Sequence, residues 1–278
     1  MPVTAATSTR RAAVLGSPID HSRSPDLHLA AYRALGLDGW TYERIDCTAD
    51  RLADLVDGLD ESWVGLSVTM PAKVAALDHA DVVTERAAMV GSANTLVRTR
   101  QGWSADCTDI DGVTGALREL GADTLGGASA VVLGAGGTAR PALAALASAG
   151  AGSVTVVVRE TARATTLLEV AETLGLSTTV VDFAPSDDLA ARCAASAVTV
   201  STVPAQAAAP LAPSVAESPR LVDAIYAPWP TPLAAAVADR GGAVAGGLVM
   251  LLHQAVTQVE LFTGRPAPLE AMADALAR

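Results

Sequence analysis

The sequence predicts an α/β fold with two domains, and three observations predict it. Its 278 residues exceed the usual length of one domain, about 150 residues, and fall a little short of two. Short apolar runs alternate with helical stretches along the chain, which is the pattern of a mostly parallel sheet covered by helices. A glycine-rich turn, Gly134-Ala135-Gly136-Gly137, stands between one such run and an alanine-rich stretch.

In the first hundred residues, the expected strands and helices alternate. They are, in order, Arg11–Leu15, Pro25–Leu35, Trp40–Ile45, Leu52–Leu59, Val64–Val68 and Pro71–Ala76. Pro71 would take the first helical position, where its fixed φ suits a helix and its missing N–H would have no partner. Thr95–Arg98 and Trp103–Ala105 flank Arg100-Gln101-Gly102, which predicts a hairpin.

From residue 109 onward the alternation is more regular. The strands Ser129–Leu133 and Ser153–Val158 flank the helix Ala139–Ala149, which predicts a β–α–β unit of about 30 residues. The Ala/Pro-rich segment Ala205–Ala216 is interpreted as a loop. The further elements are Thr161–Leu174, Thr178–Val181, Val198–Val200, Leu221–Ile225, Gly247–Phe262 and Pro268–Ala277. Since the pattern changes within Ala105–Gly112, we expect one domain of residues 1–108, joined by about 248–278, and a second of residues 109–247.

Composition and charge exclude several classes of protein. Half of the residues are hydrophobic and 18% are charged, which excludes intrinsic disorder. The 30 acidic residues against 19 basic ones give a net charge of −11, which argues against binding to nucleic acid or to anionic membranes. No apolar run of about 20 residues predicts a membrane span.

The three cysteines, Cys47, Cys107 and Cys193, lie far apart in the sequence. They fit neither a disulfide framework nor the ligand spacing of a zinc site. Residues 1–11 contain no apolar core of a signal peptide. We therefore expect a cytoplasmic protein that binds no metal.

Residues 134–139 fit the spacing G-x-G-x-x-G/A of dinucleotide-binding loops; they are Gly134, Ala135, Gly136, Gly137, Thr138 and Ala139. The first glycine permits a tight turn, the second lets a pyrophosphate approach the backbone, and the small sixth residue lets helix and strand pack closely. The N–H groups at the helix N-terminus then face the phosphates. The position between a strand and a helix favours a Rossmann-type domain over a merely tight turn.

The end of the next strand is where such domains contact the adenosine ribose. An acid there accepts from a 2′-hydroxyl, and an arginine pairs with a 2′-phosphate. Arg159 and Glu160 stand there side by side, and Arg163 follows. Two guanidinium groups favour NADP, whereas Glu160 favours NAD. A solvated helix start without a ligand is the remaining interpretation.

Polar residues also follow the expected strands of the first domain. Gly16–Pro25 follows the first strand, Ser67–Lys73 ends the third, and Asn94-Thr95 and Asp106–Asp109 stand at further strand or loop ends. Sheets of this class bind ligands at their carboxyl ends. Taken singly, each segment is also explained as an ordinary loop, and a lysine near a helix start as a solvated cation.

The combination of segments is more specific than any one of them. From about Leu15 to Gly264 the chain resembles the shikimate dehydrogenase family. The matching segments are Gly16–Pro25, Ser67–Lys73, Gly91–Thr95, Thr108–Gly112, Gly134–Arg140, Asp223–Leu233 and Gly247–Ala255. The resemblance implies a substrate domain, a Rossmann domain for NADP and a cleft between them. It also implies the reversible NADP-dependent reduction of 3-dehydroshikimate to shikimate, in aromatic amino-acid biosynthesis.

The resemblance further implies a role for each matching residue. Lys73 and Asp109 would be the catalytic pair, with Lys73 giving a proton to the alkoxide that hydride transfer creates. The residues implied to contact the substrate are Ser22, Ser24, Thr69, Asn94, Tyr226 and Gln254. The loop 134–139 would hold the pyrophosphate, Arg159 the 2′-phosphate, and Gly247 would lie beside the nicotinamide.

Some positions depart from the family pattern. Leu29 replaces an asparagine, Cys107 replaces the asparagine of N-T-D, Glu160 adds an acid beside the arginine, and Ser201–Pro204 differs from N-A-T-P. One alternative is therefore a quinate/shikimate dehydrogenase that uses NAD. Another is a non-catalytic, nucleotide-responsive binding module, against which the presence of both catalytic residues argues. The expected partner is a small-molecule substrate, and the chain is expected to be a monomer or a homodimer.

Overall fold

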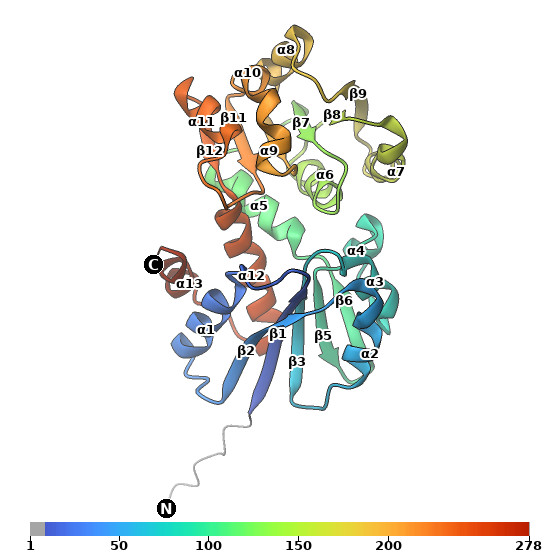
Figure 1. Cartoon of the computed structure of the whole chain (residues 1–278), viewed down its shortest axis with the longest axis vertical. Helices are drawn as coiled ribbons and strands as arrows, with labels where there is room; N and C mark the ends of the chain where they lie inside the picture. Colours follow the sequence, from blue (N-terminus) through green and yellow to red (C-terminus); the bar gives the residue numbers. More distant parts are fainter. Residues whose placement is uncertain (1–8, 278) are drawn as a thin grey trace, which may run out of the picture. The chain divides into compact units, whose positions relative to one another are not determined.

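The computed structural model describes residues 9–277, without the side chain of Arg163, and has an α/β fold with two six-stranded sheets (Figure 1). The chain divides into two compact units. The first holds the chain up to Thr108 and again from Gln254, and the second holds Asp109–His253. The helix α12 (Gly247–Thr263) contributes residues to both units. The binding roles expected for the two domains stay predictions.

The sheet of the first unit has the strand order β2-β1-β3-β5-β6-β4. Its strands are β1 (Arg10–Gly16), β2 (Trp40–Asp46), β3 (Trp63–Val68), β4 (Val82–Val83), β5 (Thr95–Thr99) and β6 (Gly102–Asp106). β1 pairs in parallel with β2 and β3, whereas β5 is antiparallel to both β3 and β6. The predicted hairpin is confirmed. Since β5 runs in the opposite direction, its start lies at the same sheet edge as the carboxyl ends of β1, β3 and β6.

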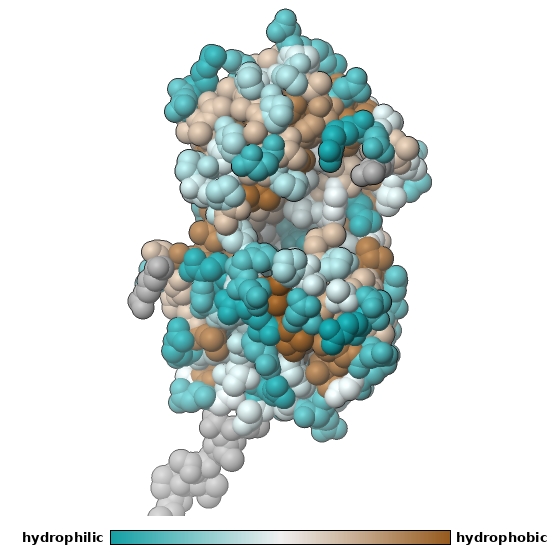
Figure 2. Space-filling view, viewed as in Figure 1, coloured by the Kyte–Doolittle hydropathy of each residue, from teal (hydrophilic) through white to brown (hydrophobic). Residues whose placement is uncertain are grey.

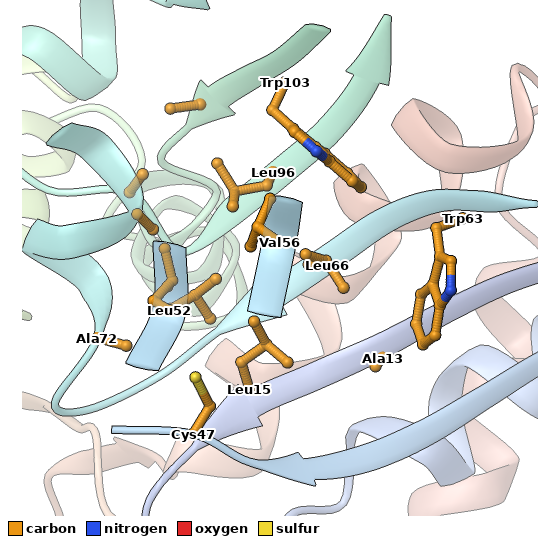
Figure 3. Close-up of a cluster of buried hydrophobic side chains, with 14 residues drawn as sticks. Ala13, Leu15, Cys47, Leu52, Val56, Trp63, Leu66, Ala72, Leu96 and Trp103 are labelled. Atoms are coloured by element: carbon orange, nitrogen blue, oxygen red, sulfur yellow. The ribbon is translucent and has the colours of Figure 1, made fainter. Parts of the chain in front are cut away.

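Helices cover both faces of this sheet, and the residues of β1 alternate between them. The helices are α1 (Ser24–Ala34), α2 (Leu52–Asp57), α3 (Lys73–His79), α4 (Glu85–Val90) and α13 (Leu269–Leu276), with a short η1 (Ala49–Arg51). Leu15 lies in a buried cluster with Leu52 of α2 and Trp63 (Figure 3). Val14 lies in another cluster, with Phe262 of α12. The two-residue period of a strand places these two neighbours on opposite faces.

The sheet of the second unit has the order β12-β11-β10-β7-β8-β9, and all its pairs are parallel. Its strands are β7 (Ser129–Leu133), β8 (Ser153–Val158), β9 (Ser177–Asp182), β10 (Val198–Ser201), β11 (Arg220–Asp223) and β12 (Ala243–Ala245). The order turns at β7 and β10, as in Rossmann dinucleotide-binding folds. The predicted fold class is therefore confirmed.

The helices of the second unit lie on both faces of its sheet (Figure 1). They are α5 (Asp109–Glu119), α6 (Ala139–Ser148), α7 (Thr165–Thr173), α8 (Asp187–Ala195), α9 (Ala205–Ala208), α10 (Ala212–Val215) and α11 (Pro232–Asp239), with the short η2 (Thr161–Ala164) and η3 (Ala209–Leu211). One buried cluster joins Leu133 of β7 to Leu189 of α8 and Leu233 of α11.

Two local expectations are wrong. The segment Ala205–Ala216 is not a loop but forms α9, η3 and α10. Leu211 and Val215 of this segment are buried in the same cluster as Leu133 of β7. Pro71 does not take the first helical position: α3 begins at Lys73, after a turn in which the Ala72 N–H donates to the Thr69 carbonyl (3.0 Å).

The surface is mostly polar on the face shown in Figure 2, with smaller apolar areas. None of the helices in the described part of the chain has the length and apolar character to cross a membrane. Among residues 9–277, no group of three or more His, Cys, Asp or Glu side chains could hold a metal ion. The three cysteines are buried and free.

Candidate active site

Backbone hydrogen bonds join the predicted loops at the carboxyl edge of β1 and β3. The Thr69 N–H donates to the carbonyl of Leu15 (2.8 Å), and the Val68 N–H donates to the carbonyl of Asn94 (2.7 Å). The Ala93 N–H donates to the carbonyl of Lys73 (3.0 Å). The loops after β1 and β3 and before β5 therefore lie together, as their place at one sheet edge requires.

Asn94 is the centre of a buried network at this edge. Its Oδ1 accepts from the Thr108 N–H (2.6 Å) and from the Thr95 hydroxyl (3.0 Å). Its Nδ2 donates to Oγ1 of Thr108 (2.9 Å) and to Oε1 of Gln254 (3.3 Å). The structure thus brings together Asn94 and Gln254, which are 160 residues apart in the sequence.

Gln258 extends this network and was missed by the sequence analysis. Its Oε1 accepts from the Ser67 hydroxyl (2.7 Å), and its Nε2 donates to Oγ1 of Thr95 (3.0 Å). The sequence did contain a signal for Gln258, because a residue four positions after Gln254 lies on the same face of a helix. A fully buried glutamine there needs polar partners, and the strand ends provide them.

His28 and Tyr42 lie beneath Gln258 and were also missed. The rings of His28 and Tyr42 are stacked with centroids 4.0 Å apart, and Nε2 of His28 is 3.3 Å from Oε1 of Gln258. Burial lowers the pKa of His28 from 6.5 to about 3, although the hydrogen bond to Gln258 acts in the opposite direction. Tyr42 donates to Ser67 (2.7 Å), and burial raises the pKa of Tyr42 above its ordinary value. Both rings are therefore neutral near pH 7.

Ser22 and Ser24 are buried at the start of α1. Nε of Arg44 donates to the Ser22 carbonyl (2.9 Å), and the Ser24 N–H donates to Oγ of Ser22 (3.3 Å). The Ser24 side chain is hydrogen-bonded to Tyr42. A path of hydrogen bonds thus connects Ser24, through Tyr42 and Ser67, to Gln258 and Asn94.

The side chain of Lys73, the first residue of α3, is unusually buried for a lysine. Lys73 is only 8% exposed, while the next residue, Val74, is 50% exposed. Lysine is rarely buried unless it has partners, so a buried lysine at a sheet edge is a candidate for chemistry. Asp109, the first residue of α5, directly follows Thr108 of the Asn94 network. Asp109 and Tyr226 belong to the second unit, and the pairing of Asp109 with Lys73 stays a prediction.

An ion pair fixes the end of β6 just before Thr108. Both Nε and Nη2 of Arg86 lie 2.6 Å from oxygens of Asp106, and the Thr84 hydroxyl donates to Oδ1 (2.8 Å). Burial alone would raise the pKa of Asp106, but the Arg86 guanidinium and the Thr84 hydroxyl hold it below its ordinary value. Asp106 therefore stays ionised and supports the strand end.

The glycine-rich loop of the second unit borders a pocket of about 320 Å³ at the carboxyl ends of β7, β8, β9 and β10. Gly134 has φ +97°, and a Cβ there would lie 2.8 Å from Cγ2 of Val203. A Cβ on Gly136 would meet no atom within 4 Å, so this backbone is open to a ligand. The pocket is lined by Gly134, Ala135, Gly136, Val158, Arg159, Glu160, Phe183, Thr202, Val203 and Pro204. The role of this loop in holding a dinucleotide phosphate stays a prediction of the spacing.

The other predicted cofactor residues lie close to this loop in the sequence or at a second pocket. Gly137 and Thr138 are half-buried in the turn before α6, and Ala139 is its buried first residue. Arg159 and Glu160 are both exposed and line the same pocket. Arg163 lies outside the residues whose side chains the structure describes. Gly247 lines a separate pocket with Tyr226.

Comparison with known proteins shows which family the chain belongs to. The family profile of the shikimate dehydrogenase substrate binding domain matches residues 14–96, and that of the shikimate 5′-dehydrogenase C-terminal domain matches residues 247–277. The shikimate dehydrogenase (NADP(+)) of Methylobacterium radiotolerans is 39% identical over 271 residues, which cover 94% of this chain and 93% of that protein. The chain belongs to the shikimate dehydrogenase family.

Solved structures of the shikimate dehydrogenase family have the same fold over nearly the whole chain. The shikimate dehydrogenase of Mycobacterium tuberculosis is 57% identical with a TM-score of 0.91, covering 96% of this chain and 99% of its own. The enzyme of Thermus thermophilus, solved with NADP(H) and shikimate, is 30% identical with a TM-score of 0.80, covering 97% and 99%.

Proposed function

We propose that the chain is an NADP-dependent shikimate dehydrogenase that reversibly reduces 3-dehydroshikimate to shikimate in aromatic amino-acid biosynthesis in the cytoplasm. The observation that carries this proposal is the buried Lys73, which lies on the edge where Asn94, Gln254, Ser22 and Ser24 are held. The first unit then binds the small-molecule substrate, and the second binds NADP.

Lys73 acts as the proton donor for the reduction. The nicotinamide of NADPH, when bound, supplies the hydride. As the substrate ketone becomes an alkoxide, the Lys73 ammonium gives it a proton, and in the reverse direction the neutral amine takes that proton back. Asp109 orients the ammonium by a hydrogen bond. Acid–base catalysis of this kind contributes roughly 10²–10⁴-fold to a rate.

Neutral groups recognise the substrate, a carboxylate with several hydroxyls. The hydroxyls of Ser22 and Ser24 donate to the carboxylate, and the amides of Asn94 and Gln254 both donate and accept. Because His28 is buried and neutral, this ring adds no cation to the network beneath them. An analogue that lacks a hydroxyl leaves buried polar atoms unpaired, so the site rejects it.

The second unit favours NADP through Arg159. This guanidinium lines the nucleotide pocket at the end of β8, where the adenosine ribose of a bound dinucleotide lies. The adjacent Glu160 lines the same pocket and favours a second candidate, an enzyme that also uses NAD and oxidises quinate. An exposed carboxylate accepts from a 2′-hydroxyl but repels a 2′-phosphate, so the two side chains compete.

The test is an assay of the purified chain with NADP and NAD, each with shikimate and with quinate. We expect the highest kcat/KM with NADP and shikimate. A preference for NAD with quinate would replace the proposal by the second candidate. Binding of NADPH without any oxidation by 3-dehydroshikimate would instead indicate a non-catalytic binding module.

A further inference from the structure

A small pocket of the second unit lies outside the nucleotide pocket described above. It has a volume of about 180 Å³ and is lined by Tyr226, Trp229, Gly246, Gly247, Leu248 and Val249. Apart from the Tyr226 hydroxyl and the indole N–H, these side chains offer no polar atom. A cavity of about 150 Å³ is enough for a benzene molecule. The pocket therefore fits one flat, weakly polar ring.

The position of the pocket in the sheet indicates which ring it receives. Tyr226 and Trp229 follow β11, and Gly246–Val249 follow β12, so the pocket lies at the carboxyl ends of these strands. The nucleotide pocket lies at the carboxyl ends of β9, β8, β7 and β10, which continue the same sheet. In folds of this order, the two halves of a dinucleotide bind on opposite sides of the turning point between β7 and β10. With the adenosine at β8, the nicotinamide falls on the side of β11 and β12.

Hydrogen bonds hold the loop of Trp229, and its ring, which is 46% exposed, packs against Gly246. Its loop is tied at both ends to the buried Asp223, which accepts from the Thr231 hydroxyl (2.6 Å) and from the Ile225 N–H (3.2 Å). The indole lies against Gly246, where a Cβ would be 2.7 Å from Cη2 of the ring. Only a glycine leaves room for the ring there, so the glycine and the tryptophan fix the wall of the pocket together.

We infer that Trp229 forms the aromatic wall of the nicotinamide subsite and contributes directly to binding of the reduced cofactor. This inference rests on the proposed NADP binding and adds to it a residue that the sequence motifs did not indicate. An aromatic wall is suited to a flat ring, because stacking on an aromatic side chain stabilises a base-sized ring by contact rather than by hydrogen bonds. A wall that is already fixed before binding loses little conformational freedom when the ring enters.

The experiment compares two probes that differ in the nicotinamide. NADPH contains it, and adenosine 2′-phosphate 5′-diphosphate, which is the adenosine half of NADPH, lacks it. We expect Trp229→Ala to weaken NADPH binding about tenfold or more and to leave binding of the adenosine half unchanged. Trp229→Phe, which keeps a flat ring, restores most of the affinity. Binding of the adenosine half also shows that the second unit of each variant is folded.

A spectroscopic readout separates contact from a general structural effect. Excitation of tryptophan sensitises emission from bound NADPH when an indole is close. We expect Trp229→Phe, which removes the indole of the second unit, to lower this emission while NADPH still binds. Unchanged NADPH affinity in Trp229→Ala, or an equal loss for both probes, would overturn the inference and leave the proposed function standing. Failure of the unaltered chain to bind NADPH would contradict the proposed function itself.

Discussion

The two units build their candidate binding edges from different parts of the polypeptide. In the first unit, buried side chains form the edge. Asn94 is hydrogen-bonded to Gln254, and Gln258 is hydrogen-bonded to Thr95 at the start of β5. In the second unit the backbone forms the edge: Gly134 makes the turn with a positive φ, and no atom lies within 4 Å of a Cβ on Gly136, where we propose that the phosphate binds. A polyol carboxylate has donors and acceptors on several sides and needs side chains placed individually. A pyrophosphate needs only N–H groups and space.

This difference predicts that substitutions at the two edges have different effects on ligand binding and on folding. Loss of one side chain from the first edge leaves buried polar atoms without partners, and therefore affects substrate and folding together. Addition of one methyl group to the second edge blocks the ligand or strains the turn, and leaves the first edge unchanged.

The largest effect is expected from Lys73→Ala. Loss of the proton donor lowers kcat by about 10²–10⁴-fold, whereas NADPH affinity barely changes because the lysine belongs to the other edge. Steady-state kinetics and direct NADPH titration measure the two quantities. Val74→Ala, which truncates the exposed next residue of the same helix, is the matched control and keeps full activity. Retained turnover in Lys73→Ala would remove this residue from the mechanism.

Two substitutions in the glycine loop are expected to affect different quantities, one the stability of the fold and the other the affinity for NADPH. Gly134→Ala places a Cβ 2.8 Å from Val203 on a residue with φ +97°, so it lowers the free energy of unfolding by about 1–3 kcal/mol. Gly136→Ala meets no protein atom, so we expect unchanged stability but NADPH binding weakened about tenfold or more. Thermal melts and NADPH titrations separate them. If Gly136→Ala binds NADPH normally, the pyrophosphate does not lie over this residue.

The buried His28 makes the stability of the first unit depend on pH. Its pKa is 6.5 in the unfolded chain and about 3 in the fold, so the unfolded state binds more protons between these values. Stability is therefore complete above pH 6.5 and falls as the pH is lowered, by up to about 2 kcal/mol between pH 7 and pH 5. His28→Phe keeps a ring between its aromatic neighbours and removes the pH dependence of stability that comes from His28.

Urea unfolding at the two pH values tests this prediction. In a Trp229→Phe background, the remaining tryptophans, Trp40, Trp63 and Trp103, all belong to the first unit and report on it alone. An equal loss of stability on acidification with and without His28 would show that other groups carry the dependence.

The smallest effect is expected from Glu160→Gln. Removal of an exposed carboxylate beside Arg159 raises affinity for NADP(H) and lowers it for NAD(H), each by up to about fivefold, because exposed charges contribute about 0.2–1 kcal/mol. The ratio of the two dissociation constants measures the change. A ratio that stays constant would mean that Glu160 does not face the adenosine ribose.

The sequence predicted the second edge better than the first for a physical reason. A glycine loop is a local motif, because the turn, the close approach and the helix start lie within residues 134–139. The network of His28, Tyr42 and Gln258 joins residues up to 230 positions apart, and none of them belongs to a short motif. Gln258 was detectable only from its place one helical turn after Gln254.

One loop assignment failed where tertiary contacts decided the outcome. The Ala/Pro-rich segment 205–216 has the composition of a loop, but burial of Leu211 and Val215 against the second sheet makes it helical. Trp229 was overlooked because a tryptophan in a proline-rich segment has no periodic pattern. Its significance comes from the facing Gly246, which follows a different strand.

The course of α12 limits how the gene can be divided. The contacts change from one unit to the other between His253 and Gln254, in the interior of a helix of 17 residues. A truncation at this border would leave unpaired carbonyl and N–H groups on both fragments, and would cut Gly247 from Gln258. Fragments meant for separate expression therefore need to duplicate the entire helix rather than share it.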